Sequence, residues 1–177
     1  MLHVGAPIGF AHRHVAPHLP IFLAKYPHLS VELQSAESDT DMIEAGFDLC
    51  IRISPHSDHD KLVYTKLAAN SRQLIATPDY LAAHGAPIKP ADLDKHRLIT
   101  HTTRSNSNYW HFRDGSGTQT INARGHLAMD SGDAMLRAVR NHSGIAVLPA
   151  YMTARHIRAS ALVTILDSSM MEDYPIH

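Results

Sequence analysis

The first third of the chain alternates between the two-residue spacing of strands and the wider spacing of helices. This pattern predicts strands at residues 2–5, 31–34 and 47–53, and helices at residues 10–25 and 38–44. Pro17 and Pro20 lie inside the first of these helices and should bend or split it, because proline lacks a backbone donor. Strands that alternate with helices at these lengths favour an α/β fold with a parallel sheet and right-handed crossovers.

The second part of the chain continues this alternation less regularly. It predicts strands at residues 62–68, 73–77, 97–102 and 161–166, a hairpin within residues 110–124, and a helix at residues 153–159. A short helix begins at Thr77 and Pro78 and ends at Gly85, and a helical turn begins at Asp92. Residues 69–72 interrupt the pattern and indicate a crossing point between two lobes.

The most informative stretch runs from residue 130 to residue 149. Ser131 is a suitable N-cap, Asp133 complements the positive start of a helix, and Gly144 is placed to end that helix. The apolar residues 145–148 then predict a buried strand. A helix start offers unpaired N–H groups and attracts anions, so this stretch can form half of a small-molecule site. The same residues also fit an ordinary strand–helix–strand packing unit.

The composition limits the classes of protein to which this chain can belong. With 177 residues, of which 44% are hydrophobic, the chain can form one ordinary domain or two small lobes. Its formal net charge of −1 gives no electrostatic footprint for nucleic acid or an anionic membrane. Cys50 is the single cysteine, which excludes an intrachain disulfide and fits a reducing compartment. No apolar stretch approaches the ~20 residues of a membrane span, and no secretory signal is visible. We therefore expect a soluble, cytoplasmic chain.

Several motifs occur in a fixed order along nearly the whole chain. They are VGAPIGF at residues 4–10, LPIFLAKYP at 19–27, GFDLCIRI at 46–53, LIATPDYL at 74–81, DSGDA at 130–134 and GIAVLP at 144–149. Each motif is unspecific alone, but the ordered set resembles the effector-binding domain of LysR-type transcriptional regulators.

The resemblance implies a fold, a function and partners. The fold would be α/β and two-lobed, like a type II periplasmic binding protein, with mixed, mostly parallel sheets. Lobe I would hold residues 1–68 and lobe II residues 69–177, with a small-molecule inducer in the cleft between them. The resemblance also implies a homodimer or homotetramer formed by these domains, for which the helix at residues 10–25 is a candidate interface. DNA would be bound only through a winged helix-turn-helix that this sequence does not contain.

The sequence also departs from the family pattern at its C-terminal end. The family's domain continues past the strand that starts at Ile176 and adds a last helix that packs on lobe I. We therefore expect a truncated chain with a partly uncovered apolar surface on lobe I.

The candidate ligand site combines helix starts with hydroxyl groups that follow strands. Helix starts at Pro7, Ile8 and Gly9 and at Ser131 and Gly132 would face each other across the cleft and offer N–H groups to an anion, such as a metabolite carboxylate. Further candidate site residues are Ser38 at a third helix start, Thr102 and Thr103 after a strand, and the counter-charges Arg52 and Arg104. The three hydroxyl residues fit plain caps and turns equally well, and arginines are commonly solvated.

Metal binding and catalysis find little support in the sequence. His14 and His18 could share a helix face, but Pro17 separates them and no third ligand is near; His56 and His59 fit an exposed loop. The sequence has no nucleophile elbow, phosphate loop or zinc-protease motif, so we expect neither an enzyme nor a cofactor. Cys50 fits an inert buried thiol. The alternatives that remain are a free-standing solute-binding protein of the same fold and a pure interaction module.

Overall fold

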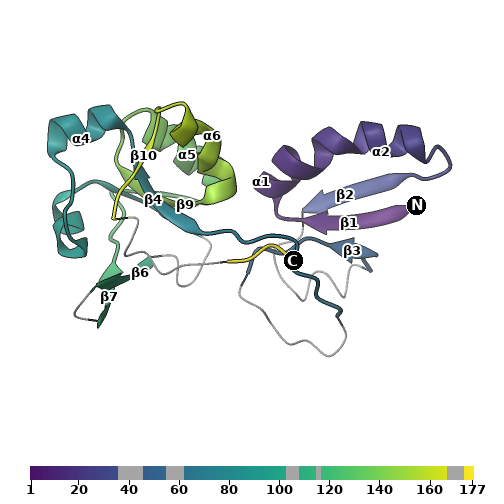
Figure 1. The fold of residues 1–177 in the computed structure, drawn as a ribbon, viewed down its shortest axis with the longest axis horizontal. Coiled ribbons are helices and arrows are strands. Elements are labelled where there is room, and N and C mark those ends of the chain that lie inside the picture. The colour runs from purple at the N-terminus through teal and green to yellow at the C-terminus, as the bar shows by residue number, and fades with distance from the viewer. Residues whose placement is uncertain (36–45, 55–61, 103–107, 115–116, 167–173) are drawn as a thin grey trace. The chain divides into compact units, whose positions relative to one another are not determined.

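Two compact units make up the chain in a computed structural model. Unit 1 comprises Met1–Ala69 and Tyr174–His177, and unit 2 comprises Asn70–Asp173 (Figure 1). The structure describes residues 1–35, 46–54, 62–102, 108–114, 117–166 and 174–177. The predicted helix at residues 38–44 lies outside these ranges. Among the described residues, no helix has the length and apolar character to cross a membrane.

Unit 1 contains a parallel sheet with strand order β2-β1-β3. The strands are β1 (Leu2–Ala6), β2 (Val31–Ser35) and β3 (Leu49–Cys50). Val4 of β1 lies opposite Leu33 of β2 and opposite Leu49 of β3. The predicted parallel arrangement of the first three strands is thus confirmed.

A helical run follows β1 and lies along one face of this sheet (Figure 1). It consists of α1 (Ile8–Phe10), the π-helical turn η1 (Ala11–Val15), the 3-10 turn η2 (Ala16–His18) and α2 (Leu19–Lys25). The predicted split is confirmed. Pro17 and Pro20 are the second residues of η2 and α2, within the first turn, where a backbone donor is not needed. The Ala16 N–H reaches back five residues to the Ala11 carbonyl, which is the π-type bond that opens the run.

Two strand predictions in unit 1 are wrong in length or type. The third strand covers only Leu49–Cys50 and lies at the sheet edge, so Leu49 is 57% exposed and Cys50 is half-buried and not covered on both faces. Residues 62–68 do not form a strand, and only Ala68 makes an isolated bridge, to Ile176. An apolar run was a poor guide here because Val63 and Leu67 are 98% and 61% exposed in this structure.

Unit 2 is built on a five-stranded sheet with order β10-β4-β9-β5-β8. Its strands are β4 (Arg72–Ala76), β5 (Leu98–His101), β8 (Leu127–Met129), β9 (Ile145–Pro149) and β10 (Val163–Thr164). β5 runs parallel to β8 and β9, whereas β4 runs antiparallel to β9 and β10. This confirms the predicted mixed sheet. The pattern did not predict β8, and it predicted β10 too long.

Both faces of this sheet are covered, which explains its nearly continuous apolar strands. On one face α5 (Gly132–Arg140) and α6 (Ala150–Arg158) pack on Ile75, Ile99 and Ala146 (Figure 1). On the other face, Leu74 and Val147 pack in a cluster with side chains from three other elements. These elements are α4 (Pro78–His84), the 3-10 helix η3 (Pro90–Lys95) and the hairpin of β6 (Tyr109–Asp114) and β7 (Gly117–Asn122).

The predicted hairpin and the predicted cap of α4 are confirmed. Trp110 and Phe112 alternate along β6 and are 1% and 0% exposed, so one hairpin face belongs to the core. The Thr77 hydroxyl accepts the N–H of Tyr80 at 3.3 Å, and Gly85 ends the helix with φ +80°.

The predicted end of α5 is wrong. The helix ends at Arg140, and His142 takes the left-handed conformation (φ +57°) that closes the turn. His142 is held there because its Nδ1 lies 2.7 Å from the hydroxyl of Thr77. Gly144 serves a different purpose, since its backbone passes close to that of Arg97.

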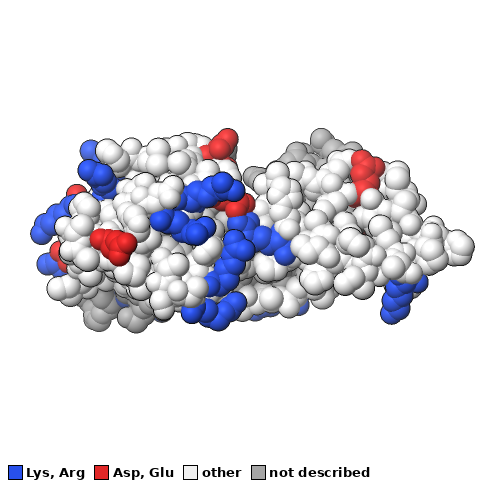
Figure 2. Space-filling view, turned by 90° about the horizontal axis from the view of Figure 1, so that it is seen from above, with Lys and Arg blue, Asp and Glu red and all other residues white. Residues whose placement is uncertain are grey.

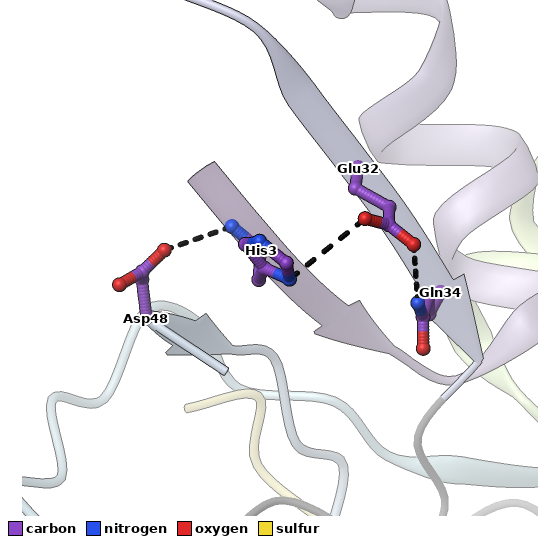
Figure 3. A network of polar contacts seen from close by, with 4 residues as sticks. All are labelled: His3, Glu32, Gln34 and Asp48. Carbon is purple, nitrogen blue, oxygen red and sulfur yellow. Dashed lines mark hydrogen bonds and ion pairs between the residues drawn. The ribbon is translucent and has the colours of Figure 1, made fainter. Parts of the chain in front are cut away.

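A polar network ties the three strands of unit 1 together near the start of β1 (Figure 3). The His3 backbone N–H donates to the carboxylate of Asp48 at 2.9 Å, and the His3 Nδ1 lies 3.8 Å from the Glu32 carboxylate. Gln34 donates to the other oxygen of Glu32. These groups are exposed, so the network contributes little stability.

Candidate functional site

The helix start of unit 1 lies directly after β1. Phe10 and Ala11 donate the first helical hydrogen bonds, both to the Pro7 carbonyl at 2.9 Å. The N–H groups of Ile8 and Gly9 precede these bonds, so they have no acceptor within the helix. Ile8 is 51% exposed. The structure therefore presents this predicted helix start at the carboxyl end of a parallel strand, where α/β sheets bind ligands.

Unit 2 brings Thr102 and Ser131 to one edge of its sheet. The parallel strands β5 and β8 place His101 opposite Met129, and the Thr102 N–H donates to the Met129 carbonyl at 2.9 Å. Thr102 is exposed and Ser131 is half-buried. Two of the predicted hydroxyls thus follow the carboxyl ends of neighbouring strands.

Ser131 caps α5 as predicted. Its backbone is extended (φ −126°, ψ 124°), and its hydroxyl accepts the N–H of Ala134 at 3.5 Å. Asp133 lies in the first helical turn. A Cβ on Gly132 would lie 3.2 Å from two side-chain atoms of Met152, so glycine allows close packing at this helix start. This half of the site offers backbone amides and one hydroxyl to a ligand.

Arg52 shares a sheet edge with the first helix start but lines a separate cavity. It follows β3, whose extension is held to β1 by the bond from Ile51 to the Gly5 carbonyl, and it exchanges two backbone hydrogen bonds with His177. The cavity, of about 460 Å³, does not have Pro7 among its lining residues. It is lined by residues 47–52, 62–65 and 67 and by His177.

Sequence reasoning missed this cavity. Tyr64 and His177 lie in its wall together with Arg52. They come from an irregular segment and from the last residues of the chain, where no periodicity marks a partner. The remaining predicted site residues, Ser38, Thr103 and Arg104, lie outside the described residues.

The thiol and the histidines also have defined surroundings. Burial raises the pKa of the Cys50 thiol, although a hydrogen bond from the Gly5 backbone and the charge of Arg52 act in the opposite direction. His14 and His18 are both exposed. Among the residues that the structure describes, no group of three potential ligands is arranged for a metal ion. His56 and His59 are not among those residues.

Several Lys and Arg side chains are exposed over unit 2 on the face drawn in Figure 2. Arg137 and Arg140 lie in the last turn of α5, and Arg155 and Arg158 lie in the last turn of α6. Positive charge at these positions complements the negative end of each helix. The opposite end of α5, which begins after Ser131, presents backbone N–H groups instead.

Comparison with known proteins identifies the chain's family. A family model described as the LysR substrate binding domain matches residues 1–175. The chain belongs to this family. Its curated relatives are regulators. An uncharacterized HTH-type transcriptional regulator of Haemophilus influenzae is 30% identical over 99% of the chain and 61% of its own length. The regulator PtxR of Pseudomonas aeruginosa is 30% identical over 93% of the chain and 53% of its own length. The chain thus spans little more than half of these relatives.

Solved structures support the fold. The regulatory domain of AphB from Vibrio vulnificus superposes with a TM-score of 0.86 at 24% identity, covering 99% of this chain and 87% of that domain. The regulatory domain of CrgA from Neisseria meningitidis gives a TM-score of 0.86 at 24% identity, covering 99% and 85%. The predicted LysR resemblance and the periplasmic-binding-protein-like fold are therefore confirmed.

Proposed function

We propose that this chain is the effector-sensing regulatory domain of a LysR-type transcriptional regulator. The observation that carries the proposal is the family match over residues 1–175, together with relatives that are transcriptional regulators. These relatives favour a regulator over the free-standing solute-binding protein and over an enzyme. DNA binding through a winged helix-turn-helix outside this sequence, self-association as a dimer or tetramer, and action in the cytoplasm belong to the same proposal.

The proposed effector is a small anion, such as a metabolite carboxylate. The helix start at Pro7, Ile8 and Gly9 and the start of α5 at Ser131 and Gly132 each offer backbone amides at the carboxyl end of a parallel strand. Units 1 and 2 would be the two lobes, with the last four residues in the first lobe. We predict that both helix starts bind the same ligand. Thr102 and Arg52 would also contact it, as would three residues outside the described ranges, Ser38, Thr103 and Arg104.

Calorimetric titration with a panel of small mono- and dicarboxylates tests the effector class. We expect at least one to bind, and Ser131→Ala to weaken that binding by ~0.5–2 kcal/mol through loss of the cap and its positioning. Thr118→Ala is the control, because it removes an exposed hydroxyl from β7, whose hairpin packs on the sheet face opposite α5, and it should leave the affinity unchanged. An unchanged affinity in Ser131→Ala would remove Ser131 from the site, and no binding by any acid would refute an anionic effector.

The regulator class has its own test. The genomic DNA upstream of the Met1 codon should encode an in-frame segment of ~60–90 residues with a helix-turn-helix pattern and a basic recognition helix. A secretory signal at that place would instead support the solute-binding protein.

A further inference from the structure

The helix α4 is held in unit 2 by the buried side chain of Tyr80, which is 1% exposed. Its ring packs in the hydrophobic cluster that also contains Leu93 of η3 and Leu98 of β5. Its hydroxyl accepts the backbone N–H of Arg97 at 3.0 Å, directly before β5. This one side chain therefore joins α4 to both η3 and β5.

Two histidines contact Tyr80, one at its hydroxyl and one at its ring. The Nδ1 atom of His96 lies 3.3 Å from the hydroxyl oxygen. The ring of His84 stacks on that of Tyr80, with 4.4 Å between the centroids and 15° between the planes. The Nδ1 atom of His84 lies 3.0 Å from the Tyr80 carbonyl oxygen. We call these contacts of Tyr80 with His84, His96 and the Arg97 N–H the Tyr80 latch.

The hydrogen bonds of the Tyr80 latch require a neutral His96. Since the hydroxyl oxygen accepts the Arg97 N–H, its own proton is directed to His96 Nδ1, which must then be an acceptor. Among the described residues, the hydroxyl has no other hydrogen-bond partner. A second proton on the His96 ring would occupy Nδ1 and remove this acceptor. Protonation of His96 therefore breaks the bond that the hydroxyl donates.

His84 can be charged without the loss of a bond in the latch. A carbonyl oxygen only accepts, so the contact with the Tyr80 carbonyl places the proton of neutral His84 on Nδ1. Its Nε2 is then the atom that takes a second proton. The resulting charge opposes a positive charge on His96. Acid therefore adds repulsion between the two histidines to the loss of the hydroxyl bond.

The surroundings of His96 favour its neutral form while the latch is closed. Burial lowers the pKa of His96, and the charge of His84 adds to this effect. Two neighbours on η3 act in opposite directions, since Asp92 raises this pKa and Lys95 lowers it. Hydration of the ring would remove the effect of burial, so protons favour an open latch over a closed one.

His96 can receive protons from solvent. It is half-buried and lines a surface cavity of about 540 Å³. The other charged residues in the wall of this cavity are Asp94 and Arg124, which have opposite signs. The cavity therefore gives the ring access to water.

The start of α4 responds differently to acid. There, Nδ1 of His142 lies 2.7 Å from the Thr77 hydroxyl, and Nε2 lies 3.7 Å from the Asp79 carboxylate. A charged His142 can still donate to the hydroxyl, and the carboxylate attracts its charge. Acid should therefore leave the start of α4 attached while it acts on Tyr80.

We propose that the Tyr80 latch is an acid-sensitive device that releases α4 from η3 and β5 on mild acidification. The latch is closed when His96 is neutral, and it opens when His96 takes a proton and leaves the Tyr80 hydroxyl. Opening uncovers Leu93 and Leu98, which are 0% and 3% exposed in the closed form. The proposal rests on contacts within unit 2 and is independent of the effector site.

Hydrogen exchange of the backbone amides, followed by NMR on the whole chain between about pH 7 and pH 5, tests the latch. The protection factor of the Arg97 amide, corrected for the intrinsic effect of pH, should fall as the pH falls. The fall should reach at most about tenfold per pH unit, which is the slope for one linked proton. The amide of Ile99, a buried residue of β5, should keep its protection.

Histidine variants identify the titrating group. His96→Gln keeps an acceptor for the Tyr80 hydroxyl but cannot titrate, so it should abolish the pH dependence at Arg97. His84→Gln should weaken this dependence without abolishing it, because the burial of His96 remains. His126→Gln is the matched control and should follow the wild type, since His126 is exposed and only its backbone N–H bonds to β5.

Three outcomes would overturn the proposal. One is a protection factor of the Arg97 amide that does not change with pH in the wild type. Another is an unchanged pH dependence in His96→Gln. The third is a parallel loss of protection at Ile99, which would show general unfolding of unit 2 instead of a local opening.

Discussion

The backbone of Gly144 passes so close to that of Arg97 that a Cβ on Gly144 would lie 2.2 Å from the Arg97 carbonyl oxygen. Gly144 also has φ +153°, a conformation that other residues rarely adopt. This close approach lets β9 begin beside β5, where Ile145 lies opposite Leu98. The contact joins two parallel strands at the centre of unit 2.

Replacement of Gly144 by alanine should therefore destabilise the fold by about 2–4 kcal/mol, from backbone strain and overpacking together. Urea unfolding followed by circular dichroism measures this loss. Gly85→Ala is the matched control, because Gly85 has φ +80° with nothing within 4 Å of its Cβ position, and it should cost less, about 1–3 kcal/mol, from backbone strain alone. Equal losses in the two variants would contradict the clash.

The environment of His96 predicts a pH-dependent stability. Burial lowers its pKa below the ordinary 6.5, the charges of His84 and Lys95 act in the same direction, and Asp92 opposes them. Because the unfolded chain then binds a proton more readily, the stability from neutral His96 is complete above pH 6.5 and is lost as the pH falls toward the folded-state pKa.

His96→Gln should reduce the loss of unfolding free energy on this acid side of pH 6.5, as urea unfolding over a series of pH values would show. His28→Gln changes an exposed histidine in unit 1 and should follow the wild-type curve. If the His96→Gln curve also parallels the wild type, His96 is not the titrating group.

Trp110 should report on the hydrophobic core of unit 2. It is the single tryptophan and is 1% exposed, so its fluorescence should be blue-shifted and should move to the red on unfolding. Trp110→Ala should cost about 3–5 kcal/mol. His111→Ala, on the exposed face of the same strand, should cost less than about 0.5 kcal/mol. A native emission like that of the unfolded chain would contradict this burial.

Cys50 should react slowly with alkylating reagents in the folded chain. Burial raises the pKa of its thiol above the ordinary 9.0, and the thiolate is the reactive form. The rate of iodoacetamide alkylation, measured against pH, should therefore inflect above pH 9.0 in the native chain and at a lower pH in urea. An inflection of the native chain below that of the unfolded chain would show that Arg52 outweighs burial.

Local signals in the sequence determined most of the elements. Neighbouring backbone groups form the helix caps at Thr77 and Ser131. The helical run divides at Pro17 and Pro20 for an equally local reason. The order of residues alone therefore predicted these features. The buried run at residues 145–148 was equally clear, because a strand covered on both faces must be apolar throughout. The ordered motifs along the chain indicated the family, and the family in turn indicated the fold.

Only the tertiary structure decided what depends on distant partners. In the sequence, Gly144 looks like the residue that ends a helix. In the structure, a glycine is needed there because the Arg97 carbonyl lies so close. The helix α5 instead ends near His142, whose side chain contacts the Thr77 hydroxyl. The apolar run at residues 62–68 is not a strand, because sheet pairing needs a neighbour that local periodicity cannot supply. For the same reason, the cavity of unit 2 that His96 and Arg124 line could not be predicted, because it forms where η3 packs on β7.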